Sequence, residues 1–247
     1  MIVISPRAFV LARKELNSWF NSPAIYGVTV FFQLFVSVWF YYLQHFFAMD
    51  TATLRPFFES FPLAFIFVVP VLTMKAWAEE KKLGSLEILF TMPFTDLELV
   101  LGKFFSCFAL IAGMVLLTLP VPLSLLPLGY FDMGVILTEY AGALLLAASA
   151  SALGLLLSSV SKNQAASFVG TAVVLLTFSL GLNQLVNILS PDLPLKLSEL
   201  VIYLSLSAHF ESFSRGLLDS RDIGFFLVTT VLFLFLNTQV LIFRRWK

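Results

Sequence analysis

Long apolar runs separated by short polar breaks dominate the sequence. Six of these runs are close to the roughly 20 residues that an α-helix needs to cross the hydrocarbon core of a bilayer. We predict membrane-spanning helices over residues 24–47, 58–77, 97–119, 135–160, 164–189 and 224–243. The pattern indicates an all-α polytopic membrane protein, with one transmembrane domain over residues 1–247.

Two further segments have helical patterns but are not predicted to cross the membrane. Residues 1–22 contain an amphipathic stretch in which Phe9, Ala12, Leu16 and Trp19 line one face, which is typical of a helix lying in the membrane interface. The outer segment 190–223 contains an apolar stretch of about ten residues, 197–206, which is too short to span. We expect it to be interfacial or re-entrant.

Composition supports the membrane class. The chain is 59% hydrophobic and 12% charged, whereas soluble domains carry roughly 25% charged residues. The net charge is zero, which indicates no nucleic-acid partner. The single cysteine, Cys107, cannot form an internal disulfide and is expected to be a small core or lipid-facing residue.

The distribution of Lys and Arg predicts an orientation. With both termini in the cytoplasm, eleven of these residues fall on the cytoplasmic side and four on the other, as the positive-inside rule requires. Glu59 and Glu139 lie near the outer ends of their predicted spans, where we expect them to reach water. No charged residue falls at the middle of a span, which argues against an ion-coupled secondary transporter.

Several enzyme classes lack their motifs here. The sequence has no His-Glu-x-x-His, no Gly-x-Ser-x-Gly and no Cys/His cluster. Gly102-Lys103 is not a Walker A loop, because Phe104 follows where Ser or Thr is required and Leu97 replaces the first glycine. We therefore expect no catalytic residue, metal or cofactor on this chain, and no enzymatic activity of its own.

The longest charged interruption, residues 78–103, predicts a short helix over 85–93. Gly84 can end the preceding helix, Ser85 is expected to be the N-cap, and Pro93 ends the segment. Thr95 and Glu98 then form a capping box that opens the next span.

The short helix is predicted to carry one apolar face. Leu86, Leu89 and Phe90 form this face, and Glu87 lies in the first turn. Two alternatives remain open for the face: it docks in a groove of a soluble partner, or it lies on lipid.

Three motifs give the sequence a family resemblance. They are Lys14-Glu15-Leu16 with Phe20-Asn21-Ser22-Pro23; Glu79-Glu80-Lys81-Lys82 with Gly84-Ser85, Glu87, Leu89, Pro93 and Gly102-Lys103; and His209-Phe210 with Ser212-Phe213, Arg215-Gly216, Asp219 and Arg221-Asp222. With these motifs the chain resembles the ABC-2 type membrane permeases, and it looks closest to the gliding-motility-associated permease subunit of bacteria. Ser85 is a mild departure, since Thr is common there.

The resemblance implies an export system in the bacterial cytoplasmic membrane. Two permease copies, or one copy and a homologue, would pair with cytoplasmic ATPases that bind ATP–Mg, and a membrane-anchored extracytoplasmic companion protein could join them. The coupling residues would be Glu79, Glu80, Gly84, Ser85, Leu86, Glu87, Leu89, Phe90 and Pro93, and the interfacial helix would place Arg7, Arg13 and Lys14 beside the ATPase. The turn at 161–164 would be a minor second contact, and His209, Phe210, Arg215, Gly216, Asp219 and Asp222 would form an outer gate.

Two readings of this arrangement remain open. The chain either moves a solute, or it is a membrane scaffold that transmits force from an ATPase without moving one. The apolar, Phe-rich spans would suit a lipid-linked or amphiphilic cargo, and they would equally serve simple packing.

Overall fold

A computed structural model describes residues 6–48, 53–182 and 203–245, and all regular secondary structure within these ranges is helical. The elements in chain order are α1 (Pro6–Phe20), α2 (Pro23–Val38), η1 (Trp39–Leu43), η2 (Phe46–Ala48), α3 (Arg55–Phe58), α4 (Ser60–Thr73), α5 (Ala78–Leu83), α6 (Ser85–Thr91), α7 (Asp96–Leu116), α8 (Pro120–Leu125), η3 (Leu126–Leu128), α9 (Met133–Val160), α10 (Gln164–Leu176), η4 (Thr177–Gly181), α13 (Leu206–Ser214) and α14 (Ser220–Arg245).

Five helical stretches are long and apolar enough to cross a membrane. They are Pro23–Ala48, Arg55–Leu83, Asp96–Leu125, Met133–Val160 and Ser220–Arg244. Each overlaps a predicted span, which confirms a multi-pass helical protein. The remaining predicted span, 164–189, begins as a shorter apolar helix, Gln164–Leu180, and its last residues lie outside the described part of the chain. The sixth span therefore stays a prediction, as does the helix at 197–206, most of which is also outside that part.

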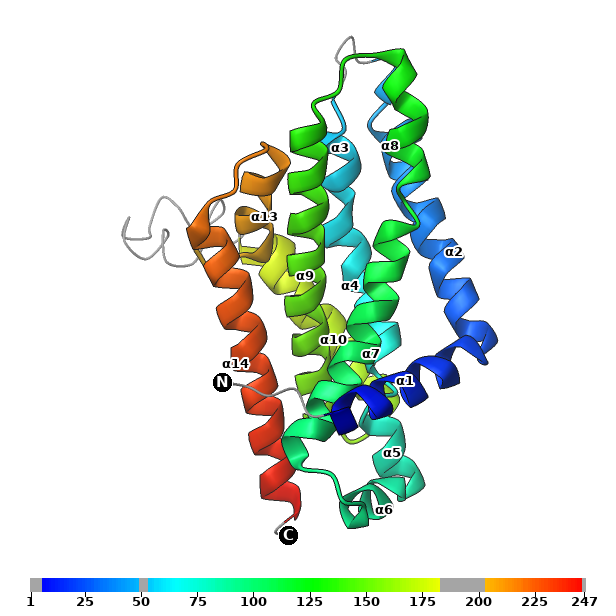
Figure 1. Ribbon diagram of the computed structural model, residues 1–247, viewed down its shortest axis with the longest axis vertical. Helices are drawn as coiled ribbons and strands as arrows, with labels where there is room; N and C mark the ends of the chain where they lie inside the picture. The colour runs from blue at the N-terminus through cyan, green and yellow to red at the C-terminus, as the bar shows by residue number, and fades with distance from the viewer. Residues whose placement is uncertain (1–5, 49–52, 183–202, 246–247) are drawn as a thin grey trace.

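The helices pack around α9 (Figure 1). This helix contacts α4, α7, α10, α13 and α14. The short helix α1 lies across α7 near the end of the molecule where α5, α6 and the C-terminus are found, whereas α13 lies beside the opposite half of α9 (Figure 1).

Small residues allow α9 to take this central position. Ala143, Ala147 and Ser151 are buried at four-residue spacing, and small residues at this spacing let neighbouring helices approach closely. A Cβ atom added to Gly142 would come within 2.6 Å of the Phe213 side chain, so α13 can approach only because that residue is glycine. Packing of this kind is needed in a membrane because lipid tails are as apolar as leucine and provide no hydrophobic drive for helix association.

The helix ends test the capping predictions. The capping box is confirmed: the Glu98 backbone N–H donates to Thr95 Oγ1 at 3.3 Å, and the Thr95 N–H donates to Glu98 Oε2 at 2.8 Å. Gly84 ends α5 with φ +69°, as its position predicted. The prediction for Ser85 was wrong. Gly84 itself occupies the N-cap of α6, and the Ser85 hydroxyl donates back to the Glu80 carbonyl at 3.3 Å.

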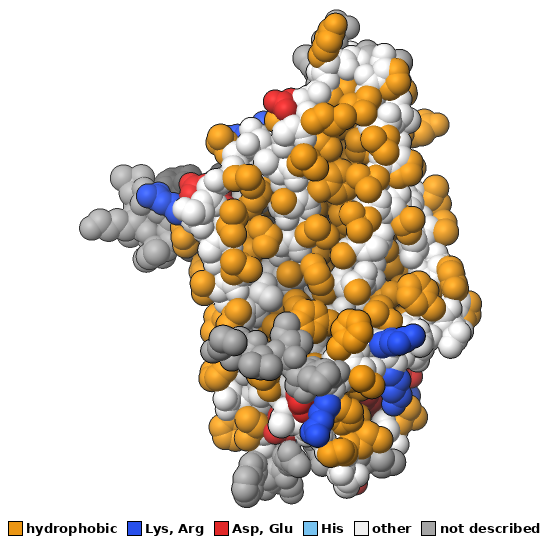
Figure 2. All heavy atoms as spheres, viewed as in Figure 1, with side chains coloured by type: hydrophobic (Ala, Val, Ile, Leu, Met, Phe, Trp, Pro, Cys, Tyr) orange, Lys and Arg blue, Asp and Glu red, His pale blue; other side chains and the backbone are white. Residues whose placement is uncertain are grey.

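The surface has the distribution expected of a membrane protein. Hydrophobic side chains cover the middle of the visible face, and charged side chains lie toward its two ends (Figure 2). Many large apolar residues of α2 and α14 are exposed, among them Tyr26, Leu34, Val228 and Val231. Such a surface is stable against hydrocarbon and would be an aggregation liability in water.

We predict that Gly154→Ala destabilises the protein. An added Cβ would lie 2.5 Å from Thr73 Oγ1 and force α9 away from α4. We expect a loss of about 1–3 kcal/mol, which is typical of overpacking, measured by thermal unfolding in detergent. Gly170→Ala is the matched control, because nothing lies within 4 Å of its added Cβ. Equal stability of the two variants would contradict the close packing of α9 on α4.

Candidate functional site

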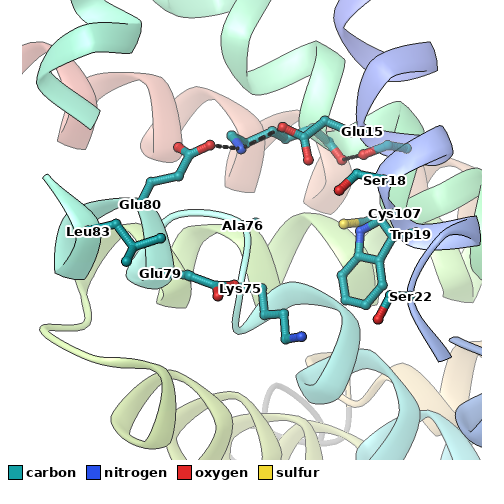
Figure 3. Close-up of a pocket in the computed structure, with 12 residues that line it drawn as sticks. Glu15, Ser18, Trp19, Ser22, Lys75, Ala76, Glu79, Glu80, Leu83 and Cys107 are labelled. Carbon is teal, nitrogen blue, oxygen red and sulfur yellow. Dashed lines mark hydrogen bonds and ion pairs between the residues drawn. The ribbon is translucent and has the colours of Figure 1, made fainter. Parts of the chain in front are cut away.

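A buried lysine joins three elements at the α6 end of the molecule. Lys103 on α7 is 2% exposed, and its Nζ lies 3.1 Å from Glu15 Oε1 on α1 and 2.6 Å from Glu80 Oε1 on α5. The same ammonium group lies 5.0 Å from the centre of the Trp77 ring. Figure 3 shows the two carboxylates converging on this group from different helices. A buried charge is costly unless it is paired, so Lys103 holds α1 and α5 against α7.

The neighbouring glycine explains how α1 comes close enough for this pairing. A Cβ atom on Gly102 would lie 2.7 Å from Leu11 Cδ2, so the α1 side chain packs directly on the α7 backbone. Gly102-Lys103 is thus a docking point for α1. Sequence reasoning excluded the pair as a nucleotide loop and missed this role. The available signal was a lysine followed by the Phe-rich stretch 104–108 within a predicted span.

A polar cavity of about 310 Å³ lies beside Lys103, between α1, α5 and α7 (Figure 3). Its lining includes Glu79 and Glu80, two predicted coupling residues, together with Glu15 and Lys75. Cys107 also lines it, and its side chain is buried in the core as predicted.

The apolar face of α6 packs on this chain itself. Leu86 and Leu89 are buried in a core cluster that also contains Trp77, Leu99 and Phe104. The side chain of Phe90 lies outside the described residues. Leu86 and Leu89 therefore face neither a partner groove nor lipid, the two alternatives that the sequence left open, because they pack against other residues of the same chain.

The outward side of α6 remains available to another molecule. Glu87 is exposed, and Leu83 and Met92, which flank the helix, are 71% and 41% exposed. These three side chains combine an acid with two apolar groups, a mixture suited to a protein contact.

Helix α1 also contacts the far end of the segment 78–93, which contains α5 and α6 and is called the elbow below. The guanidinium of Arg7 donates to the Pro93 carbonyl at 3.1 Å, directly after α6. Helix α1 is therefore linked to the α5–α6 segment at both ends: Arg7 bonds directly after α6, and Glu15 shares Lys103 of α7 with Glu80 of α5. Arg13 and Lys14 lie on the same helix and are exposed.

The C-terminal end of α9 attaches to the same elbow. Lys81 donates to the carbonyls of Ser158 and Ser161 at 3.1 Å each, and also to the carbonyl of Ser159. The Ser158 hydroxyl accepts from the backbone N–H groups of Trp77 and Ala78 at 3.2 Å.

A second cation reaches this end of α9 from α14. Arg244 donates to the Val160 carbonyl at 3.1 Å. Cations are favourable at a helix C-terminus, where carbonyls lack intrahelical partners. Sequence reasoning identified only the turn at 161–164 and missed these anchors.

At the opposite end, the structure brings together two of the predicted gate residues. His209 Nδ1 lies 2.6 Å from Asp222 Oδ1, and His209 Nε2 lies 2.8 Å from the Tyr203 carbonyl. The imidazole stacks on Phe225 with ring centroids 3.8 Å apart. These contacts join α13 to the first turn of α14.

The other gate residues have separate roles. Phe210 is buried in the core, and Gly216 has φ +76° just after α13. Arg215 pairs with Glu211 at 2.6 Å, and the same carboxylate oxygen of Glu211 lies 3.1 Å from Arg55. The Asp219 carboxylate accepts from the Arg221 backbone N–H at 2.9 Å.

The two outer carboxylates differ in their surroundings. Glu59 is exposed as predicted and pairs with Arg55 at 2.8 Å. The prediction that Glu139 reaches water was wrong: it is 0% exposed, and neither carboxylate oxygen has a hydrogen-bond partner among the described residues. Its position on the central helix explains the burial, since neighbouring helices cover α9. Glu139 lines a small cavity of about 110 Å³ together with Thr53 and Asp132.

Comparison of the chain with protein-family models gave no match, and neither did comparison with curated proteins. The resemblance to ABC-2 permeases therefore stays a prediction that rests on the three sequence motifs.

We predict that Lys103→Met destabilises the corner formed by α1, α5 and α7. The substitution leaves Glu15 and Glu80 facing each other without a cation, and breaking a buried pair costs about 3–5 kcal/mol, less where the partners are partly exposed as here. Thermal unfolding and protease cleavage near α1 would measure the change. Lys82→Met, at an exposed lysine on α5, is the matched control and should behave as wild type. Equal cleavage of the two variants would argue against the docking role of Lys103.

We also predict that Glu139→Gln is at least as stable as the wild type. Glutamine has the shape of glutamate without its charge, so it avoids the cost of a buried carboxylate that has no partner. The thermal unfolding midpoint at neutral pH tests this. A fall in the midpoint would show that the carboxylate contributes a stabilising contact.

Proposed function

We propose that this chain is the permease subunit of an ABC-2 type ATP-binding cassette transporter. It would couple ATP hydrolysis by a separate ATPase, which holds ATP–Mg, to export or conformational work across the bacterial cytoplasmic membrane. The observation that carries the proposal is the attachment of α6. The segment that carries this short helix is tied to α1 through Arg7 and Pro93, which follows α6, and to α7 through the pair of Lys103 with Glu80 on the preceding helix, α5.

This attachment suits α6 for transmitting force. Leu86 and Leu89 fix its inner side on the core, so a push on its outer side cannot be absorbed by rotation of the helix alone. The outer side carries Glu87, Leu83 and Met92, which would contact the ATPase. Lys14 on α1 is exposed at the same end and would extend the contact. The excess of Lys and Arg supports a cytoplasmic location for this end and for both termini.

A continuous route leads from α6 toward the other end. Lys81 on α5 holds the C-terminal carbonyls of α9, and α9 runs the length of the bundle to α13 (Figure 1). There the Thr138 hydroxyl lies 3.3 Å from the Phe213 carbonyl, so α9 and α13 are bonded to each other. A shift of α9 would therefore reach the outer segment around His209 and Asp222, where we place the gate.

The exposed helices leave room for a second subunit. In the apolar part of Pro23–Ala48 only 22% of the residues are buried, and the share in Ser220–Arg244 is the same. A second permease copy or a homologue could pair along either helix, and lipid would cover the remainder. An extracytoplasmic companion protein would bind at the α13 end.

The test is co-purification of the full chain with a Walker-motif ATPase, followed by substitutions in the elbow. Gly84→Pro cannot adopt φ +69°, because proline holds φ near −65°, so α6 would be displaced. Glu87→Ala removes the outward acid. We expect both variants to insert normally and to weaken ATPase binding by about tenfold, the loss typical of a central interface residue.

Lys82→Ala, at an exposed position on α5, serves as the control and should retain wild-type binding. Unchanged ATPase binding and coupling in both elbow variants would refute α6 as the docking element. Intact coupling in reconstituted vesicles with no translocated solute would instead support the scaffold that transmits force.

A further inference from the structure

An apolar groove separates part of α1 from α7. The hollow has a volume of about 830 Å³. Phe9 and Leu16 on α1 and Phe105, Ala109 and Gly113 on α7 contribute to its walls. It is distinct from the polar cavity beside Lys103, whose lining residues lie on other faces of these helices.

The groove is elongated along α7. Its lining extends from Phe105 to Leu116, which is about 16 Å of helix at 1.5 Å per residue. The space beside Gly113 is empty, since a Cβ atom added there would meet no other atom within 4 Å. A groove of this length with apolar walls has room for an extended hydrocarbon chain.

Arg13, on the α1 wall, is the single charged residue in the lining of the groove. Arg13 is exposed and makes no hydrogen bond or ion pair with the residues that the structure describes. A guanidinium group matches phosphate oxygens with two parallel hydrogen bonds. Lys14, the next residue, does not line the groove.

The surroundings of α1 indicate that the groove opens to lipid. Phe9, Val10 and Phe20 are 69%, 63% and 54% exposed, and so much aromatic and aliphatic surface on one short helix requires an apolar medium. A cation in the lining of an apolar groove matches an amphiphile with an anionic head and a hydrocarbon tail.

We propose that this groove binds one anionic phospholipid, with its phosphate on Arg13 and one acyl chain along Ala109 and Gly113. The lipid would fill the space between α1 and α7 and stabilise the position of α1. The site depends on the membrane location of the chain and is independent of whether an ATPase binds α6.

The test is native mass spectrometry of the full chain, titrated with phosphatidylglycerol or with phosphatidylcholine of the same acyl chains. We expect one phosphatidylglycerol per chain, retained about tenfold more tightly than phosphatidylcholine. Arg13→Gln should abolish the preference between the two lipids. Gly113→Leu should remove binding of both, because its side chain occupies the channel.

Two controls separate the site from general effects. Lys14→Gln removes an adjacent positive charge outside the groove, and Gly27→Leu adds the same side chain at an open position on α2. Both should bind as wild type. Each variant must keep the wild-type unfolding midpoint without lipid, and Ala109→Leu replaces Gly113→Leu if the latter does not fold.

Three outcomes would overturn the proposal. Equal retention of the two lipids by the wild type would show binding of the acyl chain only. Retention of phosphatidylglycerol by the variants that fill the channel would place the lipid elsewhere. Conversion of a dimer to a monomer by Gly113→Leu, with unchanged lipid binding, would show that a second copy of the chain occupies the groove.

Discussion

The pairing of the buried Lys103 ammonium is the constraint on which the α6 end of this molecule depends. Glu15 and Glu80 come from helices that are far apart in sequence, and each must stay in place for the charge to remain satisfied. Gly102 makes the arrangement possible by letting Leu11 pack on the α7 backbone. Because α1 and α5 share one cation, neither can move far from α7 alone. The corner therefore behaves as a unit, and α6 projects from it.

Helix α9 links this corner to the other end of the molecule. Its C-terminal carbonyls are held by Lys81 and Arg244, and its small residues allow close approach of α4 and α13. Close packing of small residues resists bending, so a displacement at one end is transmitted along the helix. The same central position buries Glu139 without a partner.

The inward packing of Leu86 and Leu89 changes which surface of α6 a proposed partner would meet. The sequence left two alternatives open for its apolar face, a groove of a soluble partner or lipid. The side that remains exposed carries Glu87 between apolar residues, which favours a partner surface with a basic group and a shallow apolar rim. On α1, the polar cavity and the apolar groove lie on different faces.

The sequence by itself determined the helical class, five of the spans and the caps at Gly84 and Thr95, because these depend on local properties. A span requires only apolar length, and a cap requires only the residues next to it. Tertiary structure decided the pairing of Lys103, the burial of Glu139, the inward face of α6 and the contact between His209 and Asp222. Each of these depends on which helix lies alongside, and the spacing of residues within one helix carries no information about its neighbour. The shift of the α6 N-cap from Ser85 to Gly84 has a local cause, since the left-handed glycine that ends α5 also begins α6.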